Sequence, residues 1–237
     1  FHKSVIKAKK LIETKKYGSV LNVKATYGKS KFINFNQNDW RTKRIIAGGG
    51  ILLDQGIHIV DLLLYFFGTF EEVKSLVQNN CWNFDVEDNA YALMKTDEGV
   101  VAMLHSSATQ WRHRFNLEIN LQRGNIILGG ILSGSKSYGE ETLTVVTADP
   151  NNDAGNPIEQ TTKYNKDPSW ESEINSFINS IINKKPLDSL KELMNNNKLK
   201  LPYNIPSITT GIFGYMGYEM IQYFENINLQ KNMKVGL

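Results

Sequence analysis

Residues 48–61 read GGGILLDQGIHIVD, which combines three glycines, an apolar run and three ionisable side chains. The residues from Ile51 to Phe67 are mostly apolar, so we expect a helix that is buried nearly all round. Helical periodicity gathers four of its polar side chains within an arc of about 60° on one face: Asp54, His58, Asp61 and Tyr65. Because burying an unpaired carboxylate costs several kcal/mol, this stripe predicts either an internal polar network or a pocket.

Two chemistries fit the stripe. Asp54 and His58 lie one helical turn apart, so His58 could transfer a proton near neutral pH while the carboxylate fixes its tautomer or holds substrate hydroxyls. Alternatively, Asp54, His58 and Asp61 ligate a metal, with His105 or His113 completing the set. We rank the metal second, because three ligands on one helix converge poorly and the spacing matches no metal motif. A structural stripe, with backbone-bound carboxylates and a core histidine, ranks behind a functional site.

The glycine run 48–50 matches neither G-x-G-x-x-G nor G-x-x-x-x-G-K-[ST], and no predicted strand precedes it. It indicates instead a close approach of backbone at the helix entry. We expect its amides to be free to face a ligand.

The rest of the chain changes from helical to strand patterns. Helical spacing covers His2–Lys16 and the residues after Ser169. Strand patterns cover Val20–Tyr27, Glu72–Val77, Ala90–Lys95, Val100–Ala108, Phe115–Gln122, Asn125–Leu128, Thr142–Thr147 and Glu159–Tyr164. This succession predicts an α+β domain with a mainly antiparallel sheet and helices on one face.

Composition excludes several classes of protein. The chain has 237 residues, 27 basic and 24 acidic, and no basic block, so a nucleic-acid partner is not expected. The single cysteine, Cys81, cannot form an internal disulfide, which suits a reducing compartment. No signal peptide and no run of about 18 uncharged apolar residues is present, so we expect a cytoplasmic protein with no membrane partner. Position 1 is not Met, which indicates that the natural protein begins further upstream.

Three motifs together resemble the substrate domain of the Gfo/Idh/MocA oxidoreductases. These are D-W-R-T, the run G-G-G-x-L-x-D-x-G-x-H-x-x-D, and the L-L-x-x-x-G that follows. The early Y-G-S-V-L-N-V and the later SSATQWRHRFNLEINLQRGNIIL are also similar to elements of that family, and the resemblance covers about residues 1–184.

The resemblance implies a large open sheet and hydride transfer between NAD or NADP and a hydroxyl or carbonyl of a sugar, cyclitol or sugar nucleotide. It makes His58 the proton donor or acceptor and Asp54 its partner. The W-R pair, Trp40 and Arg41, matches a substrate-binding position, although a surface arginine on a polar loop is an equal alternative. Two further residues could line a sugar cleft or simply end a strand: Trp111 and Arg112.

The family's dinucleotide fingerprint and its E-K-P motif are absent from this sequence. Both would lie upstream of Phe1, so the Rossmann domain is missing and the chain alone should bind NAD(P) poorly. We therefore predict the substrate half of a dehydrogenase that is inactive by itself. Alternatives are a non-catalytic sugar-binding or oligomerisation module and, less favoured, a metal-dependent lyase or isomerase. An open sheet exposes an apolar face, so we expect a homo-oligomer formed face to face.

The last part of the chain, about residues 186–237, resembles a segment of anthranilate synthase component I. A proline-bracketed stretch there precedes G-x-F-G-Y-x-x-Y-[DE], but that enzyme's chorismate-site motifs are missing. We interpret this part as a joined segment, with a divergent terminal helix as the alternative. The predicted domains are therefore 1–185, the substrate and oligomerisation domain, and 186–237, an atypical tail.

Overall fold

A computed structural model describes residues 1–30, 40–132, 137–149 and 155–182. The chain divides into two compact units, Phe1–Ser172 and Glu173–Leu237. The sheet, the helices α1 to α3 and every predicted site residue belong to the first unit. The predicted tail, 186–237, lies outside the described residues.

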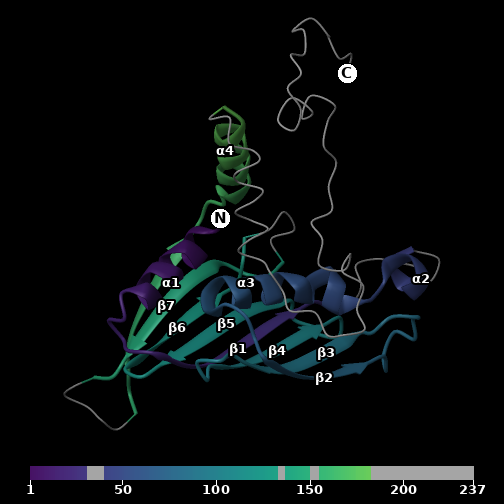
Figure 1. Ribbon diagram of the computed structural model, residues 1–237, viewed down its shortest axis with the longest axis horizontal. Helices are drawn as coiled ribbons and strands as arrows, with labels where there is room; N and C mark the ends of the chain where they lie inside the picture. Colours follow the sequence, from purple (N-terminus) through teal and green to yellow (C-terminus); the bar gives the residue numbers. More distant parts are fainter. Residues whose placement is uncertain (31–39, 133–136, 150–154, 183–237) are drawn as a thin grey trace, which may run out of the picture. The chain divides into compact units, whose positions relative to one another are not determined.

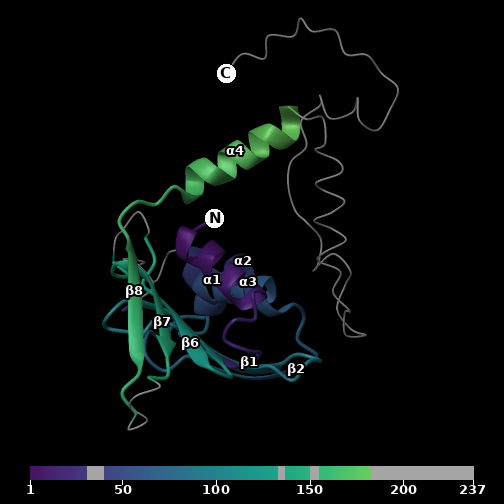
Figure 2. The same ribbon diagram turned by 90° about the vertical axis from the view of Figure 1, so that its left-hand side faces the viewer.

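One open sheet of eight strands forms the framework, in the order β2-β3-β4-β1-β5-β6-β7-β8. Its strands are β1 (Val20–Gly28), β2 (Glu72–Gln78), β3 (Asn89–Lys95), β4 (Val101–Ser107), β5 (Arg114–Leu121), β6 (Gly124–Gly129), β7 (Glu141–Thr147) and β8 (Ile158–Tyr164). The central pair β1–β4 is parallel, and each other neighbouring pair is antiparallel. Helices α1 and α3 cover the same face of this sheet (Figures 1 and 2). The predicted α+β class with a mainly antiparallel sheet is thus confirmed.

Helix α1 (Lys3–Glu13) packs Val5 and Ala8 against the sheet. Its start is fixed by the buried carboxylate of Glu141 at the beginning of β7. The Ser4 hydroxyl donates to Glu141 Oε1 at 2.5 Å, and His2 Nδ1 lies 2.9 Å from Oε2. These bonds join the N-terminal helix to the far half of the sheet.

The predicted helix Ile51–Phe67 is not one regular α-helix. It begins with a π-helical turn, η2 (Leu52–Gly56), and continues as α3 (Ile57–Phe67). It is also not buried nearly all round, because it lies on one face of the sheet and only one side meets the core. Ile59, Leu63 and Phe66 are buried, whereas the predicted polar stripe is exposed or half-exposed.

Upstream of it lie a short 3₁₀ turn, η1 (Trp40–Thr42), and α2 (Arg44–Ala47), which ends at Gly48 with a φ of 80°. Among the described residues, Arg44–Phe67 is long and apolar enough to cross a membrane, with a mean hydropathy of 1.5. A core helix of a soluble protein meets the same criterion, so this is weak evidence of a span.

The main core lies between α1, α3 and the covered face of the sheet. Its fully buried side chains alternate along the central strands, as expected for a sheet covered on one side. They include Val23, Ala102, Leu117, Ile119, Ile126 and Leu128.

Candidate functional site

Asp54 lies on the π-helical turn, and its carboxylate forms an ion pair with Lys29. Lys29 Nζ donates to Asp54 Oδ2. The lysine is 1% exposed, while the Asp54 side chain is 29% exposed, so the pair joins the protein interior to the surface. Lys29 is not among the residues predicted from the sequence, and it binds Asp54 in the place where His58 was expected.

His58 lies on the exposed side of α3, one turn further on. Its ring centroid is 6.3 Å from that of Tyr27, near the end of β1. Both rings line a hollow of about 380 Å³ with mixed polar and apolar walls, whose other lining residues include His2, Asp61, Leu62, Phe115, Asp167 and Trp170. An imidazole at the wall of such a hollow can exchange a proton with a bound hydroxyl group.

Tyr27 also contacts Tyr138, which in turn binds Gln55. Gln55 Nε2 donates to the Tyr138 hydroxyl, and the rings of Tyr138 and Tyr27 pack edge to face at 5.0 Å. Burial, followed by the neighbouring Tyr138 and Asp54, raises the pKa of Tyr27 far above its ordinary value. Burial also raises the pKa of Tyr138. Both phenols therefore stay protonated at physiological pH.

The glycine run approaches backbone closely, as predicted, but the amides of Gly48 and Gly50 are not free for a ligand, and that of Gly48 donates to the carbonyl of Arg44 at 2.7 Å. Glu87 Oε1 accepts from the amides of Gly50 at 2.8 Å and Leu52 at 3.1 Å. A Cβ on Gly50 would lie 2.1 Å from the Glu87 carbonyl oxygen, so only glycine fits there. A carboxylate thus occupies the amides that a bound phosphate would need.

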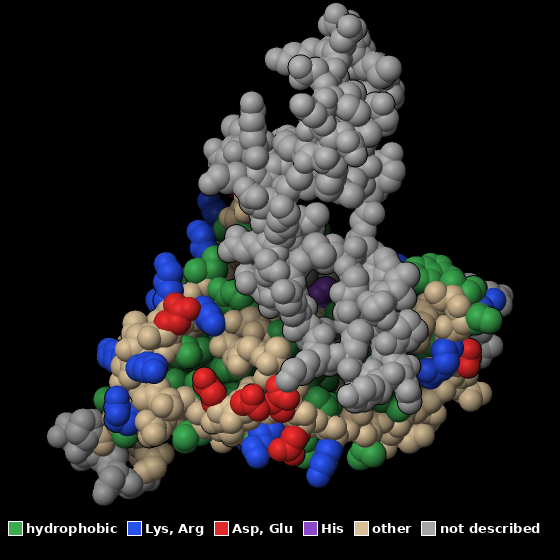
Figure 3. All heavy atoms as spheres, in the orientation of Figure 1, with side chains coloured by type: hydrophobic (Ala, Val, Ile, Leu, Met, Phe, Trp, Pro, Cys, Tyr) green, Lys and Arg blue, Asp and Glu red, His purple; other side chains and the backbone are tan. Residues whose placement is uncertain are grey.

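Trp40 and Arg41 are brought close to Asp54. They line, with Asp54, Gly49 and Leu53, a second hollow of about 160 Å³. The Arg41 guanidinium lies 4.6 Å from the centre of the Trp40 ring. Hydrophobic side chains also gather over the adjoining helix α2 (Figure 3), where Ile45 is 93% exposed.

Trp111 and Arg112 line neither of these hollows. Trp111 is 78% exposed, and its ring lies 6.4 Å from that of Trp82. Their predicted role in substrate binding stays a prediction.

The residues named for a metal site are dispersed. His105 stacks on Tyr91 at 4.4 Å, on the sheet face opposite α3, and His113 Nε2 lies 3.1 Å from Ser30 Oγ. Within the described part of the chain, no three His, Cys, Asp or Glu side chains are grouped to hold a metal ion.

The open, mainly antiparallel sheet with helices on one face defines the chain as an α+β domain. The chain belongs to the Gfo/Idh/MocA family. The family's C-terminal domain matches residues 5–127, which confirms the resemblance seen in the motifs.

Solved structures share this fold. Apo levoglucosan dehydrogenase is 22% identical, with a TM-score of 0.55, and the match covers 70% of this chain and 46% of that one. A 3-ketoreductase from Actinomadura kijaniata is 17% identical, with a TM-score of 0.60, over 75% of this chain and 50% of that one. An oxidoreductase domain protein from Kribbella flavida is 22% identical, with a TM-score of 0.55, over 70% of this chain and 45% of that one. The chain spans about half the length of these proteins.

A separate and short match links the chain to anthranilate synthase component 1 of Cereibacter sphaeroides. It is 38% identical over 42 residues, which is 18% of this chain and 8% of that protein. A match this short does not support assigning the activity of anthranilate synthase to this chain.

Proposed function

We propose that the chain is the substrate-binding and catalytic domain of an NAD(P)-dependent oxidoreductase that acts on a hydroxyl or carbonyl group of a sugar, cyclitol or sugar nucleotide. Family membership supports the class of reaction. Related structures were solved with NADH and levoglucosan, with NADH and L-sorbose, and with NADP. The observation that carries the proposal is the His58 imidazole at the wall of the 380 Å³ hollow.

The described residues do not by themselves fit a dinucleotide. The amides of Gly50 and Leu52 donate to Glu87, whose negative charge would repel a pyrophosphate. NAD or NADP would therefore be held mainly by another part of the protein, and it would supply the hydride acceptor or donor.

The roles of this chain's own side chains follow from their positions. His58 accepts the proton of the substrate hydroxyl during oxidation and returns it to the carbonyl oxygen during reduction. Tyr27 and Phe115 form an aromatic wall of the hollow, and Asp61 presents hydrogen-bond acceptors to sugar hydroxyls. Asp54 faces the neighbouring hollow of Trp40 and Arg41.

The test is a turnover assay of the complete natural polypeptide. Sugars and cyclitols are supplied as substrates, and the absorbance of NAD(P)H is measured over time. His58→Ala should lower turnover by about two to four orders of magnitude. Tyr65→Phe is the control, since Tyr65 lies on the same exposed side of α3, two turns further on. Turnover of His58→Ala close to that of Tyr65→Phe would contradict the proposed role.

A sugar-binding or oligomerisation module without redox chemistry is the alternative. An upstream reading frame that encodes a strand, G-x-G-x-x-G, a helix and then E-K-P would support the enzyme. An unrelated upstream frame would support the module.

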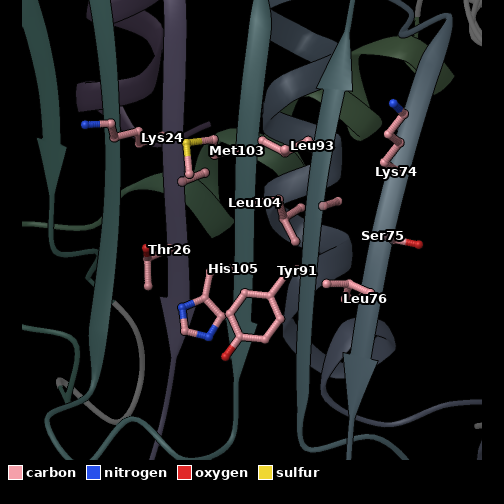
Figure 4. Close-up of a pocket in the computed structure, with 12 residues that line it drawn as sticks. Lys24, Thr26, Lys74, Ser75, Leu76, Tyr91, Leu93, Met103, Leu104 and His105 are labelled. Atoms are coloured by element: carbon pink, nitrogen blue, oxygen red, sulfur yellow. The ribbon is translucent and has the colours of Figure 1, made fainter.

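For either function, we further propose a homo-oligomer formed through the open sheet face. That face holds an apolar groove of about 590 Å³ over β1 to β4. Figure 4 shows the side chains that form it, among them Leu76, Tyr91, Leu93, Met103 and His105. Exposed apolar surface of this kind is removed from water when two copies pack face to face.

Sedimentation of the purified chain tests the oligomer. Leu93→Glu should shift it to the monomer, because burying a carboxylate in the apolar contact is costly. Leu21→Glu is the matched control, since Leu21 is 49% exposed against 50% for Leu93 but does not line the groove. A monomeric wild-type chain, or equal behaviour of the two variants, would refute this interface.

A further inference from the structure

The end of β1 lies under the segment that carries the predicted acid and base. Tyr27 and Lys29 are two residues apart on extended backbone, so they point to the same side at a spacing of about 6.6 Å. Asp54 lies in the π-helical turn η2, and His58 lies four residues further on, at the start of α3. The two pairs meet: Lys29 binds Asp54, and the Tyr27 ring lies 6.3 Å from that of His58.

The backbone of Lys29 is fixed on both sides. Its amide donates to the carbonyl of Ser107 at 2.9 Å, and its own carbonyl accepts from the amide of Gln110 at 2.9 Å. These bonds extend the pairing of β1 by one residue beyond the strand. The Lys29 side chain, which carries the ammonium group, therefore extends from a backbone that is held in place.

Burial makes this contact obligatory. At 1% exposure the ammonium group of Lys29 has lost its water, and a buried charge without a counter-ion is strongly destabilising. Asp54 supplies that counter-ion through Oδ2. One carboxylate oxygen is thus held from inside the protein, while the residue still faces the hollow of Trp40 and Arg41.

We propose that Lys29 is a positioning residue, which holds the Asp54 carboxylate in a fixed orientation at the hollow of Trp40 and Arg41, next to the hollow that His58 lines. The role rests on the function proposed above, because it acts on the reaction only through Asp54. It gives the chain a buried cation at the site, supplied by the end of β1 itself.

The first test needs no substrate and uses urea unfolding of the 237-residue chain. Asp54→Asn removes the carboxylate that binds the buried ammonium, so the unfolding midpoint should fall. Adding Lys29→Met removes that charge, and the double variant should be more stable than Asp54→Asn alone. Lys24→Met is the matched control, since Lys24 lies on β1, five residues before Lys29, and lines the groove on the opposite face. A further loss of stability in the double variant would overturn the ion pair.

The second test measures turnover of the complete polypeptide. Lys29→Met should lower kcat by about a hundredfold, with a smaller change in KM, because a carboxylate misplaced next to the reacting group reduces the rate more than binding. Lys29→Arg should recover part of kcat, and Lys24→Met should leave it unchanged. If the wild type turns over normally and Lys29→Met has the same kcat as Lys24→Met, the inference about Lys29 is wrong, while the proposed function stands. No wild-type turnover of any sugar would overturn the proposed function, and the catalytic role of Lys29 with it.

Discussion

Replacing Gly50 with alanine should destabilise the start of η2, the turn that carries Asp54. A Cβ at this position would lie 2.1 Å from the Glu87 carbonyl oxygen and 2.9 Å from the Glu87 amide nitrogen. Both atoms belong to backbone, so no side-chain rotation can relieve the contact. Real Cβ contacts below 3.0 Å are essentially never seen, so the two segments must separate by about 1 Å.

The cost follows from the hydrogen bonds at this contact. Glu87 accepts from the amides of Gly50 and Leu52 at 2.8 and 3.1 Å through its carboxylate, and from Ile51 at 3.1 Å through its carbonyl. A separation of about 1 Å breaks at least two of them. Bonds to a charged acceptor contribute about 1.5–3 kcal/mol each. Alanine restricts the unfolded chain and returns about 0.4–1 kcal/mol, so the expected loss is about 3 kcal/mol.

Urea unfolding followed by circular dichroism measures this loss, which should lower the midpoint by about 1 M. Gly49→Ala is the control, because its new Cβ would meet side chains and no backbone: Leu53 at 3.0 Å, and Glu87 Oε1 in ordinary contact at 3.6 Å. Neither glycine has a positive φ, so the pair isolates the contact with Glu87. Equal midpoints for Gly50→Ala and Gly49→Ala would refute the reasoning.

Two further predictions concern pH. Burial alone would raise the pKa of Glu141, but hydrogen bonds from His2 and Ser4 outweigh it and bring the pKa below 4.5. The stability that this carboxylate contributes is present above about pH 4.5 and is lost as the pH falls through the lowered pKa. When the urea midpoint is plotted against pH, Glu141→Gln should therefore reduce the slope on the acid side. Burial lowers the pKa of His105 from 6.5, so stability should fall as pH drops below 6.5. His105→Gln should remove that slope, and an unchanged slope would assign it to another group.

Much of the fold could be predicted from the sequence because its signals are local. Alternation along each strand and the order of the elements led to an α+β domain with a mainly antiparallel sheet, and the family match agrees. The single parallel pair, β1–β4, joins strands far apart in the chain. Nothing in either segment specifies that partner, so it could not be predicted.

The polar stripe was predicted correctly in its alignment and wrongly in its burial. Periodicity depends only on the helix itself, and it gathered Asp54, His58 and Asp61 on one side. Burial depends on how many layers surround the helix. Here one sheet face covers Ile59, Leu63 and Phe66 and leaves the other side open.

Lys29 shows what local patterns miss. Its contact with Asp54 spans 25 positions of sequence and comes from the end of a strand, where a lysine ordinarily reads as a surface residue. One sequence feature could have drawn attention to Lys29: it directly follows Gly28 at the end of a strand with alternating residues. A buried charge needs a partner, but only the fold reveals that it is buried.

The π-helical turn explains why the acid and the imidazole do not pair with each other. A π-helical turn forms i→i+5 bonds and winds more residues into each turn than an α-helix does. Asp54 lies inside η2 and His58 just after it, so the regular one-turn stacking assumed from the sequence does not apply. Asp54 meets Lys29 and the hollow of Trp40, while His58 meets Tyr27 and the larger hollow. The two groups therefore line neighbouring hollows, and each has its nearest described partner at the end of β1 rather than in the other.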